Sequence, residues 1–166
     1  MKGKIISFGI LLVLLLGAGL AVNQIKTSSK PTLSAATHDY ANTTVKVGSK
    51  TFAVELGLTS DQQALGLGKR DALAPSAGML FVFKPAQIAT FWMKDMRFPL
   101  DMVWINNGRV IGISRNVPVP PAGTTTAKLP TYSPNALVDY VLEVNAGQAD
   151  NVSIGDQFQV VDSQAV

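Results

Sequence analysis

Two carboxylates in apolar surroundings are the residues of this sequence that could most directly do chemistry. Asp101 lies between Leu100 and Met102, and Glu143 lies in the apolar run VDYVLEV at positions 138–144. An ionised carboxylate in such a place must be exposed, paired or hydrogen-bonded, because its isolated burial is costly. If the two groups converged, they would suit acid/base catalysis or an oxygen-ligated cation.

Each carboxylate also has a structural interpretation. For Asp101 this is a buried or half-buried ion pair that fixes a sheet, and four basic residues could supply the partner: Arg70, Lys94, Arg97 and Arg109. Glu143 shares its predicted strand face with Asp139, a pattern that is typical of a solvated face. Both interpretations stay open at the level of the sequence.

The segment 91–108 (FWMKDMRFPLDMVWINNG) contains both tryptophans, Trp92 and Trp104, and three of the five methionines. Alternation along predicted strands assigns most of these side chains to a core. Trp92 has a second interpretation, as an aromatic platform for a sugar ring or a peptide. The residues that we expect in a binding site of this kind are Arg70, Trp92, Lys94, Asp101 and Glu143.

Most familiar catalytic signatures are missing. The sequence has no cysteine, which excludes disulfides, thiolate nucleophiles and Cys-ligated zinc. Its one histidine, His38, lies in a polar connector, which argues against a histidine triad or a His-rich metal site. No phosphate-binding glycine loop, G-x-S-x-G elbow or Ca²⁺ loop is present. We therefore expect no metal and no cofactor, and a non-enzymatic role is favoured over a catalytic one.

The distribution of charge argues against nucleic acid as a partner. From residue 40 onward, ten Lys and Arg balance ten Asp and Glu. The net charge of +3 comes from four lysines less Asp39 in the N-terminal region. A polyanion footprint would instead need a basic patch on the folded part.

The N-terminus has the pattern of a membrane-insertion segment. Lys2 and Lys4 precede eighteen uncharged, mostly apolar residues at 5–22, which as a helix would span about 27 Å. Residues 1–22 are predicted to be a signal anchor or a cleaved signal peptide, and residues 23–42 a flexible tether. The folded part, 43–166, is expected outside the cytoplasm, tethered to the membrane or exported.

Strand and turn signals dominate the rest of the chain. Alternation around Gly48-Ser49 predicts a hairpin, and a capping box at 59–62 predicts a short helix over 60–66. The run 79–83 reads as a strand, with 88–94 as its antiparallel neighbour across a turn at 84–87. Asn107-Gly108 predicts a second hairpin, and 138–144 and 157–161 are further strands.

One long segment, 116–134, is rich in proline and threonine and lacks periodicity. It is either a binding loop or a stiff connector. Short strands and frequent turns elsewhere indicate a mainly β fold, an antiparallel sandwich or barrel with one or two short helices.

Five motifs occur together in an order that resembles one known family. They are GLGKR (66–70), GMLFVF (78–83), FWMKDMRFPLDMVWINNGRVIGI (91–113), YVLEVNAG (140–147) and IGD (154–156). The chain thereby resembles domain-of-unknown-function family 192. The resemblance implies a mainly β domain of jelly-roll-like topology, often exported or membrane-tethered in bacteria, with no established activity. Gly68 and the pair Asp95-Met96 depart from the family's usual pattern.

Three functions are consistent with these observations. The first is a membrane-tethered, extracytoplasmic β domain that binds a small molecule, a glycan or a protein near Trp92, Asp101 and the 116–134 loop. The second is an enzyme, a hydrolase or lyase, that uses Asp101 and Glu143 as its carboxylates. The third is a structural component of an envelope assembly, which predicts a large exposed apolar patch.

Overall fold

A computed structural model of the protein describes residues 40–161. The predicted membrane segment at 5–22 lies outside these residues, as does most of the predicted tether. Within the described part of the chain, no helix has both the length and the apolar character that crossing a bilayer requires.

The described residues form a mainly β fold, as predicted, with seven strands in one sheet and two in another. The large sheet has the strand order β6-β5-β8-β3-β2-β1-β9, and β4 pairs with β7 in the small one. The strands are β1 (Asn42–Val47), β2 (Lys50–Gly57), β3 (Ala77–Gln87), β4 (Phe91–Trp92), β5 (Leu100–Asn106), β6 (Arg109–Val117), β7 (Thr131–Tyr132), β8 (Val138–Asn145) and β9 (Phe158–Val160). The helices are α1 (Ser60–Leu65) and the single 3₁₀ turn η1 (Thr126–Lys128).

Both predicted hairpins are confirmed. β1 and β2 pair in antiparallel fashion around a turn in which Gly48 has a φ of +55°. β5 and β6 do the same around Asn107 and Gly108, whose φ values are +48° and +70°. Asparagine and glycine tolerate positive φ better than other residues, so the local sequence determines these two turns.

The connection from β2 to β3 differs from the prediction. The predicted helix is confirmed, with Thr59 and Gln62 forming a capping box and Gly66 following its last residue. The segment that contains this helix returns the chain to the end of the sheet at which β2 began. β2 and β3 therefore run parallel and not antiparallel. The large sheet is therefore mixed.

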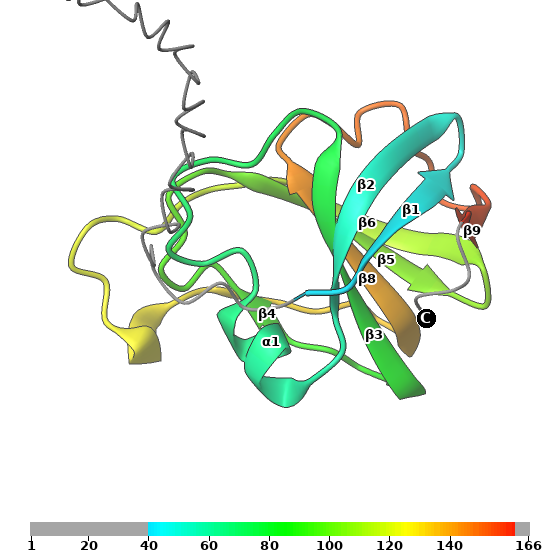
Figure 1. Cartoon of the computed structure of the whole chain (residues 1–166). Helices are drawn as coiled ribbons and strands as arrows, with labels where there is room; N and C mark the ends of the chain where they lie inside the picture. The colour runs from blue at the N-terminus through cyan, green and yellow to red at the C-terminus, as the bar shows by residue number, and fades with distance from the viewer. Residues whose placement is uncertain (1–39, 162–166) are drawn as a thin grey trace, which may run out of the picture. The chain divides into compact units, whose positions relative to one another are not determined.

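The large sheet curls until its two edges approach each other (Figure 1). The Phe158 N–H donates to the Gly108 carbonyl at 2.8 Å, and the Val110 N–H donates to the Asp156 carbonyl at 2.9 Å. The rings of Tyr140 in the central strand β8 and Phe158 in the edge strand β9 are 5.1 Å apart, so they meet inside the curl. One curled sheet thus takes the place of the two facing sheets that a sandwich would have.

Two hydrophobic clusters cover the two faces of this sheet. The inner cluster contains Val103, Leu142 and Val144 among other residues, and it fills the curl. The outer cluster contains alternate residues of the same strands, such as Met79 and Met102, under the segment 89–98. Because both faces of the central strands are covered, β3 is buried at six consecutive positions, 78–83.

The prediction for residues 84–94 is wrong. β3 continues to Gln87, and the segment after it does not return beside it as an antiparallel neighbour. Its short strand β4 pairs with β7, which lies within the segment 116–134. That segment therefore contributes a strand and the turn η1, and it helps to hold β4 over the outer face of the sheet.

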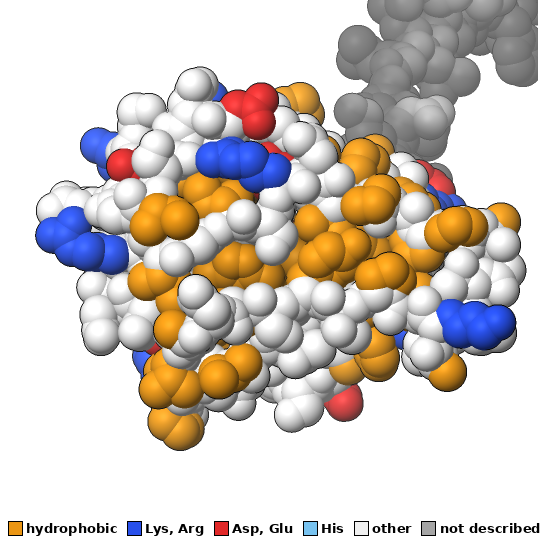
Figure 2. Space-filling view, turned by 180° about the vertical axis from the view of Figure 1, so that it is seen from behind, with side chains coloured by type: hydrophobic (Ala, Val, Ile, Leu, Met, Phe, Trp, Pro, Cys, Tyr) orange, Lys and Arg blue, Asp and Glu red, His pale blue; other side chains and the backbone are white. Residues whose placement is uncertain are grey.

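The surface opposite to the view of Figure 1 carries scattered charge. Figure 2 shows hydrophobic side chains across the middle of this face, with lysine and arginine side chains standing singly around them. The exposed large hydrophobic residues of the described part include Leu58, Ile88, Trp92, Leu137 and Ile154.

Candidate functional site

Glu143 is buried on the outer face of the large sheet, in contrast to the solvated position that its spacing from Asp139 suggested. It lies in β8 between Met79 of β3 and Met102 of β5 in the strand register, and it is 4% exposed. Among the described residues, none gives its carboxyl a hydrogen bond or an ion pair. Burial alone raises the pKa of Glu143 from 4.5 to about 8, so the carboxyl is mostly protonated at neutral pH.

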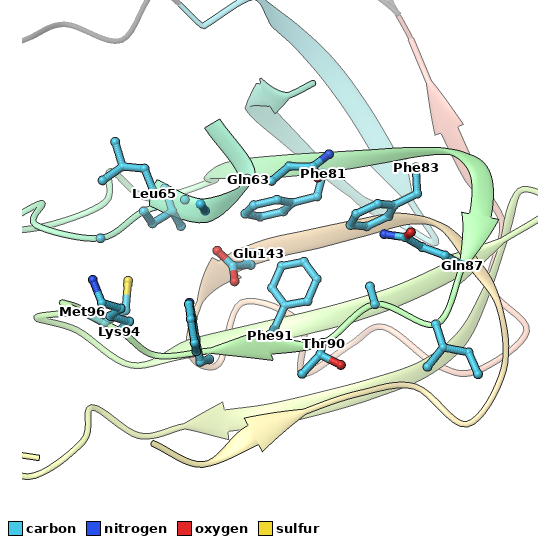
Figure 3. Close-up of a pocket in the computed structure, with 17 residues that line it drawn as sticks. Gln63, Leu65, Phe81, Phe83, Gln87, Thr90, Phe91, Lys94, Met96 and Glu143 are labelled. Atoms are coloured by element: carbon cyan, nitrogen blue, oxygen red, sulfur yellow. The ribbon is translucent and has the colours of Figure 1, made fainter. Parts of the chain in front are cut away.

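The Glu143 carboxyl faces a pocket of about 290 Å³ (Figure 3). Figure 3 shows the carboxyl projecting into the space beside Phe81 and Phe91. One wall consists of α1 and the turn after it, residues 63–68, and the opposite wall consists of residues 87–92 with Lys94 and Met96. The site thus combines one buried acid with walls that carry both aromatic rings and polar groups, among them Gln63, Gln87 and Thr90.

The aromatic wall is held by ring contacts. Phe91 meets Phe81 edge to face at a centroid distance of 4.8 Å, and it meets Trp104 in the same manner at 5.6 Å. Such T-shaped contacts fix ring orientation more tightly than burial alone. The next residue, Trp92, is 43% exposed and lines the rim of the pocket.

The turn after α1 approaches the opposite wall closely because of Gly68. Its N–H donates to the Leu65 carbonyl at 3.0 Å. A Cβ at this position would lie 2.9 Å from the Leu65 carbonyl oxygen and 3.2 Å from that of Lys94. A side chain here would therefore push the two walls apart. Gly68 and Met96, two positions that depart from the family pattern, both line the pocket.

Lys94 lines the pocket without pairing with Glu143. Its ammonium lies 3.2 Å from the Asp95 carboxylate, and the side chain is 42% exposed. Beside it, a second hollow of about 220 Å³ lies against residues 120–129, so the 116–134 segment adjoins the site.

Asp101 lies on the other face of the sheet. It pairs with Val144 in the strand register, while Met102 pairs with Glu143, and successive strand residues point to opposite faces. Its carboxylate is fully buried and accepts hydrogen bonds from the Asn116 N–H at 2.8 Å and the Ala149 N–H at 2.9 Å. The ion pair expected for Asp101 is replaced by these two amides. The acid/base pair of Asp101 and Glu143 is not formed.

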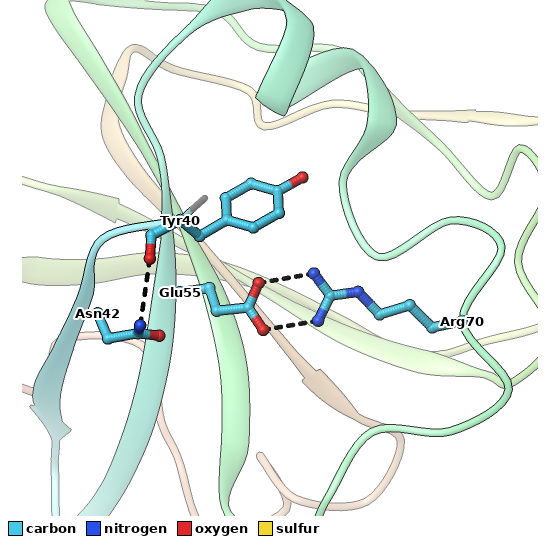
Figure 4. Close-up of polar contacts among 4 residues, drawn as sticks. All are labelled: Tyr40, Asn42, Glu55 and Arg70. Carbon is cyan, nitrogen blue, oxygen red and sulfur yellow. Dashed lines mark hydrogen bonds and ion pairs between the residues drawn. The ribbon is translucent and has the colours of Figure 1, made fainter. Parts of the chain in front are cut away.

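Arg70 also lies away from the pocket lining. Its guanidinium donates two hydrogen bonds to the Glu55 carboxylate, at 2.7 and 2.6 Å, as Figure 4 shows. It also lies 5.6 Å from the centre of the Tyr40 ring. The bonds to Glu55 raise the pKa of Arg70 above its already high value. The other basic candidates have partners elsewhere: Arg97 pairs with Asp71, and Arg109 donates to the Gly155 carbonyl.

Of the five predicted site residues, the structure brings together Trp92, Lys94 and Glu143. Sequence reasoning missed Phe81 and Phe91 as pocket walls, because their apolar alternation is typical of ordinary core packing. It also missed residues 63–68, at the end of α1 and in the turn after it. Gln63 gives no signal in the sequence either, yet its amide donates to the Gly57 and Val82 carbonyls and ties α1 to the sheet. No group of three potential metal ligands occurs among residues 40–161.

Comparison with known proteins identifies relatives over the folded part. The model of domain-of-unknown-function family 192, described as "Uncharacterized ACR", matches residues 43–160. No curated protein matches the chain.

Two solved structures resemble this one. The first is a Sinorhizobium meliloti 1021 protein with the provisional name of a transcription regulator. It is 33% identical, covers 73% of this chain and 95% of its own, and has a TM-score of 0.64. The second is a protein of unknown function from Novosphingobium aromaticivorans DSM 12444. It is 27% identical, covers 80% of this chain and 94% of its own, and has a TM-score of 0.65.

Proposed function

This chain belongs to domain-of-unknown-function family 192, and from that premise we propose that it is a binding protein for one small organic molecule, held in the pocket over Glu143. The observation that carries the proposal is the carboxyl of Glu143, which is 4% exposed, has no partner among the described residues and faces a pocket of about 290 Å³.

Buried polar groups in proteins almost always have a hydrogen-bond partner. Leaving a buried polar group without a partner costs roughly 1–3 kcal/mol. A ligand that bonds to Glu143 would recover this free energy on binding. The volume is at the lower end of the range for small-molecule sites, and the ring-lined wall is typical of them.

The pocket favours a small molecule over the other two ligands considered from the sequence. A glycan could stack on Trp92 at the rim, but the space beside the Glu143 carboxyl is bounded by the Phe81 and Phe91 rings, which give sugar hydroxyls no hydrogen bond. A protein partner would bury the rim and leave the Glu143 carboxyl unpaired. A compact ligand with an apolar body and one polar group fits both parts of the site.

Two other functions have less support. DNA binding, which the provisional name of the Sinorhizobium relative suggests, needs a basic surface. In this chain ten basic residues balance ten acidic ones from residue 40 onward, and those seen in Figure 2 stand apart. Catalysis by Asp101 with Glu143 has no support, because the two groups lie on opposite faces of the sheet.

We also propose that the protein acts outside the cytoplasm. The support is the sequence alone: an apolar run at 5–22 behind Lys2 and Lys4. Mass spectrometry of the N-terminus of the protein purified from its host would separate an anchor from a cleaved signal peptide. A mature protein that starts near residue 22 would rule out the anchor. Recovery in the cytoplasmic fraction would rule out both.

A fragment screen tests the binding function. We expect ligand-observed NMR with the full-length protein to detect binders of about 10–15 non-hydrogen atoms, a size that fits the pocket. Two rim substitutions on opposite walls, Ala64→Trp and Thr90→Trp, should each weaken these binders at least tenfold by filling the entrance.

Ile154→Trp is the matched control, because Ile154 is 71% exposed and does not line the pocket. This variant should bind as the wild type does. A screen without binders, or binders that both rim variants bind with unchanged affinity, would overturn the proposed function.

A further inference from the structure

We propose that the ligand of this pocket carries a basic amine, whose ammonium group pairs with Glu143 while its apolar body lies against Phe81, Phe91 and Trp92. This inference rests on the proposed function and specifies its ligand. Two features of the pocket support it: a buried acid without a cationic partner among the described residues, and aromatic rings in the walls.

The pocket contains the Glu143 carboxyl, and no cationic side chain of the described residues pairs with that carboxyl. Of its lining residues, only Lys94 and Glu143 have side chains that titrate. Lys94 is paired with Asp95 and partly exposed, so its charge is already compensated outside the buried part. The last turn of α1, which forms one wall, has no basic residue. Within the described residues, the positive partner that would allow Glu143 to ionise is missing, and a ligand ammonium would supply it.

The remaining walls also favour a cation. Phe81 and Phe91 place aromatic rings beside the Glu143 carboxyl (Figure 3), and Trp92 also lines the pocket. Aromatic faces attract ammonium groups, more strongly where water is excluded. An anionic ligand would find no such support. It would have to compete with Asp95 for Lys94, and its charge would meet the negative faces of the aromatic rings.

Amine binding has a proton balance that distinguishes it from other modes. Burial raises the pKa of Glu143 to about 8, so at pH 6 the empty pocket holds a neutral carboxyl. When an ammonium group enters, the carboxyl O–H gives its proton to the buffer and an ion pair forms, so one proton is released per ligand. A neutral ligand that accepts a hydrogen bond from the protonated carboxyl releases none.

The pH dependence follows from the same balance. An alkylamine stays protonated up to about pH 10, as a lysine side chain does. Its affinity should therefore rise about tenfold per pH unit between pH 5 and 7 and level off above pH 8, where Glu143 is already ionised. A neutral acceptor should show the opposite trend and bind most weakly above pH 8.

Three probes of one shape test the inference: 4-phenylbutylamine, 4-phenylbutanol and 4-phenylbutyrate. Calorimetric titration of the full-length protein at pH 6, in two buffers of different ionisation enthalpy, measures the affinity of each and the protons released. We expect the amine to bind at least tenfold more tightly than the alcohol at pH 8, with close to one proton released at pH 6. The butyrate should bind most weakly.

Glu143→Gln supplies the control within the pocket. It keeps the side-chain shape and removes the charge, so the preference for the amine, its pH dependence and its proton release should all disappear. A thermal unfolding transition close to that of the wild type shows that the variant is folded.

The two levels of the proposal fail in different ways. If the alcohol or neutral fragments bind and the amine shows neither a preference nor proton release, the amine inference is overturned and the binding function stands. If none of the probes binds and the fragment screen finds no binder, both are overturned.

Discussion

Asp101 and Glu143 are two buried carboxyl groups on adjacent strands, one residue out of register with each other, and they have opposite surroundings. Asp101 lies on the inner face of the curled sheet and accepts two backbone N–H groups. Glu143 lies on the outer face, receives no hydrogen bond from a described residue and faces a pocket. The Asp101 carboxyl is thus used to stabilise the fold, whereas the Glu143 carboxyl has no partner within the described fold and is available to a ligand.

The surroundings of Asp101 account for its role. Its two oxygens connect β5 to Asn116 near the end of β6 and to Ala149 in the turn that follows β8. Asn116 has a φ of +51°, a conformation that such a hydrogen bond helps to hold.

Glu143 has no comparable compensation, since burial is the only cause of its altered pKa. Binding sites often contain a polar group that destabilises the fold until a ligand binds, because the group is held away from water in the position that the ligand requires. The comparison therefore predicts opposite effects of mutation at the two positions.

Removing the Asp101 carboxylate should have the largest effect. Asp101→Ala removes the acceptor of the part-buried Asn116 amide and of the buried Ala149 amide, and we expect the free energy of unfolding to fall by about 3–5 kcal/mol. Urea denaturation followed by circular dichroism measures this loss. Asp150→Ala, at an exposed carboxylate, is the control and should change stability by less than about 0.5 kcal/mol. A loss below about 1 kcal/mol for Asp101→Ala would break the comparison.

The second-largest effect should be a pH dependence of stability that comes from Glu143. Because its pKa is raised from 4.5 to about 8 in the folded state, the folded protein holds this proton more tightly than the unfolded chain does. The resulting stabilisation is complete below pH 4.5 and is lost as the pH rises to 8, at up to about 1.4 kcal/mol per pH unit.

The measurement is the difference in unfolding free energy between the wild type and Glu143→Gln at pH 5 to 9. Subtracting the variant cancels the titration of all other groups that the substitution leaves unchanged. We expect the difference to fall with pH and to become constant above pH 8. A difference that does not vary with pH would show that Glu143 is solvated.

Local sequence was sufficient to predict much of the fold. The turns at Gly48 and at Asn107-Gly108, the capped helix and the strand at 138–144 each depend on residues within a few positions of one another. The partners of a strand depend on distant residues. For that reason the parallel pairing of β2 with β3 and the pairing of β4 with β7 could not be read from the chain.

The candidate site, like the fold, was predicted only in part from the sequence. Trp92, Lys94 and Glu143 were singled out for their chemistry, and they do come together. Arg70 and Asp101 were singled out on the same grounds and lie elsewhere. Asp101 is one residue out of register with Glu143, which places its side chain on the other face of the sheet. Arg70 lies in the loop after α1 and pairs with Glu55 of β2. The burial of Glu143 was missed, since its cover comes from α1, the following turn and β4, far away in sequence.

Replacing Glu143 with an apolar residue of similar length should stabilise the protein. Glu143→Met removes a desolvated carboxyl beside Met79 and Met102, and we expect a gain of about 1 kcal/mol at pH 7 that is larger at pH 9. Thermal unfolding at both pH values measures it. The matched substitution at a paired carboxyl, Glu55→Met, should instead reduce stability, because it leaves Arg70 without its partner. A loss of stability in Glu143→Met at pH 9 would mean that an unrecognised partner holds the carboxylate.

Arg70→Lys should have the smallest effect. It tests whether the pocket is independent of the ion pair between Arg70 and Glu55. Lysine keeps the charge and loses the two-bond geometry with Glu55, at side chains that are 27% and 29% exposed. We expect a loss of less than about 1 kcal/mol, since partly exposed ion pairs contribute little. The pH profile of the difference attributed to Glu143 should be unchanged, and so should the affinity of 4-phenylbutylamine, because Arg70 does not line the pocket. A weakened affinity in Arg70→Lys, with Arg109→Lys as the control, would mean that the Arg70–Glu55 pair is coupled to the pocket. The separation between a structural carboxylate network and an available carboxyl would then need to be abandoned.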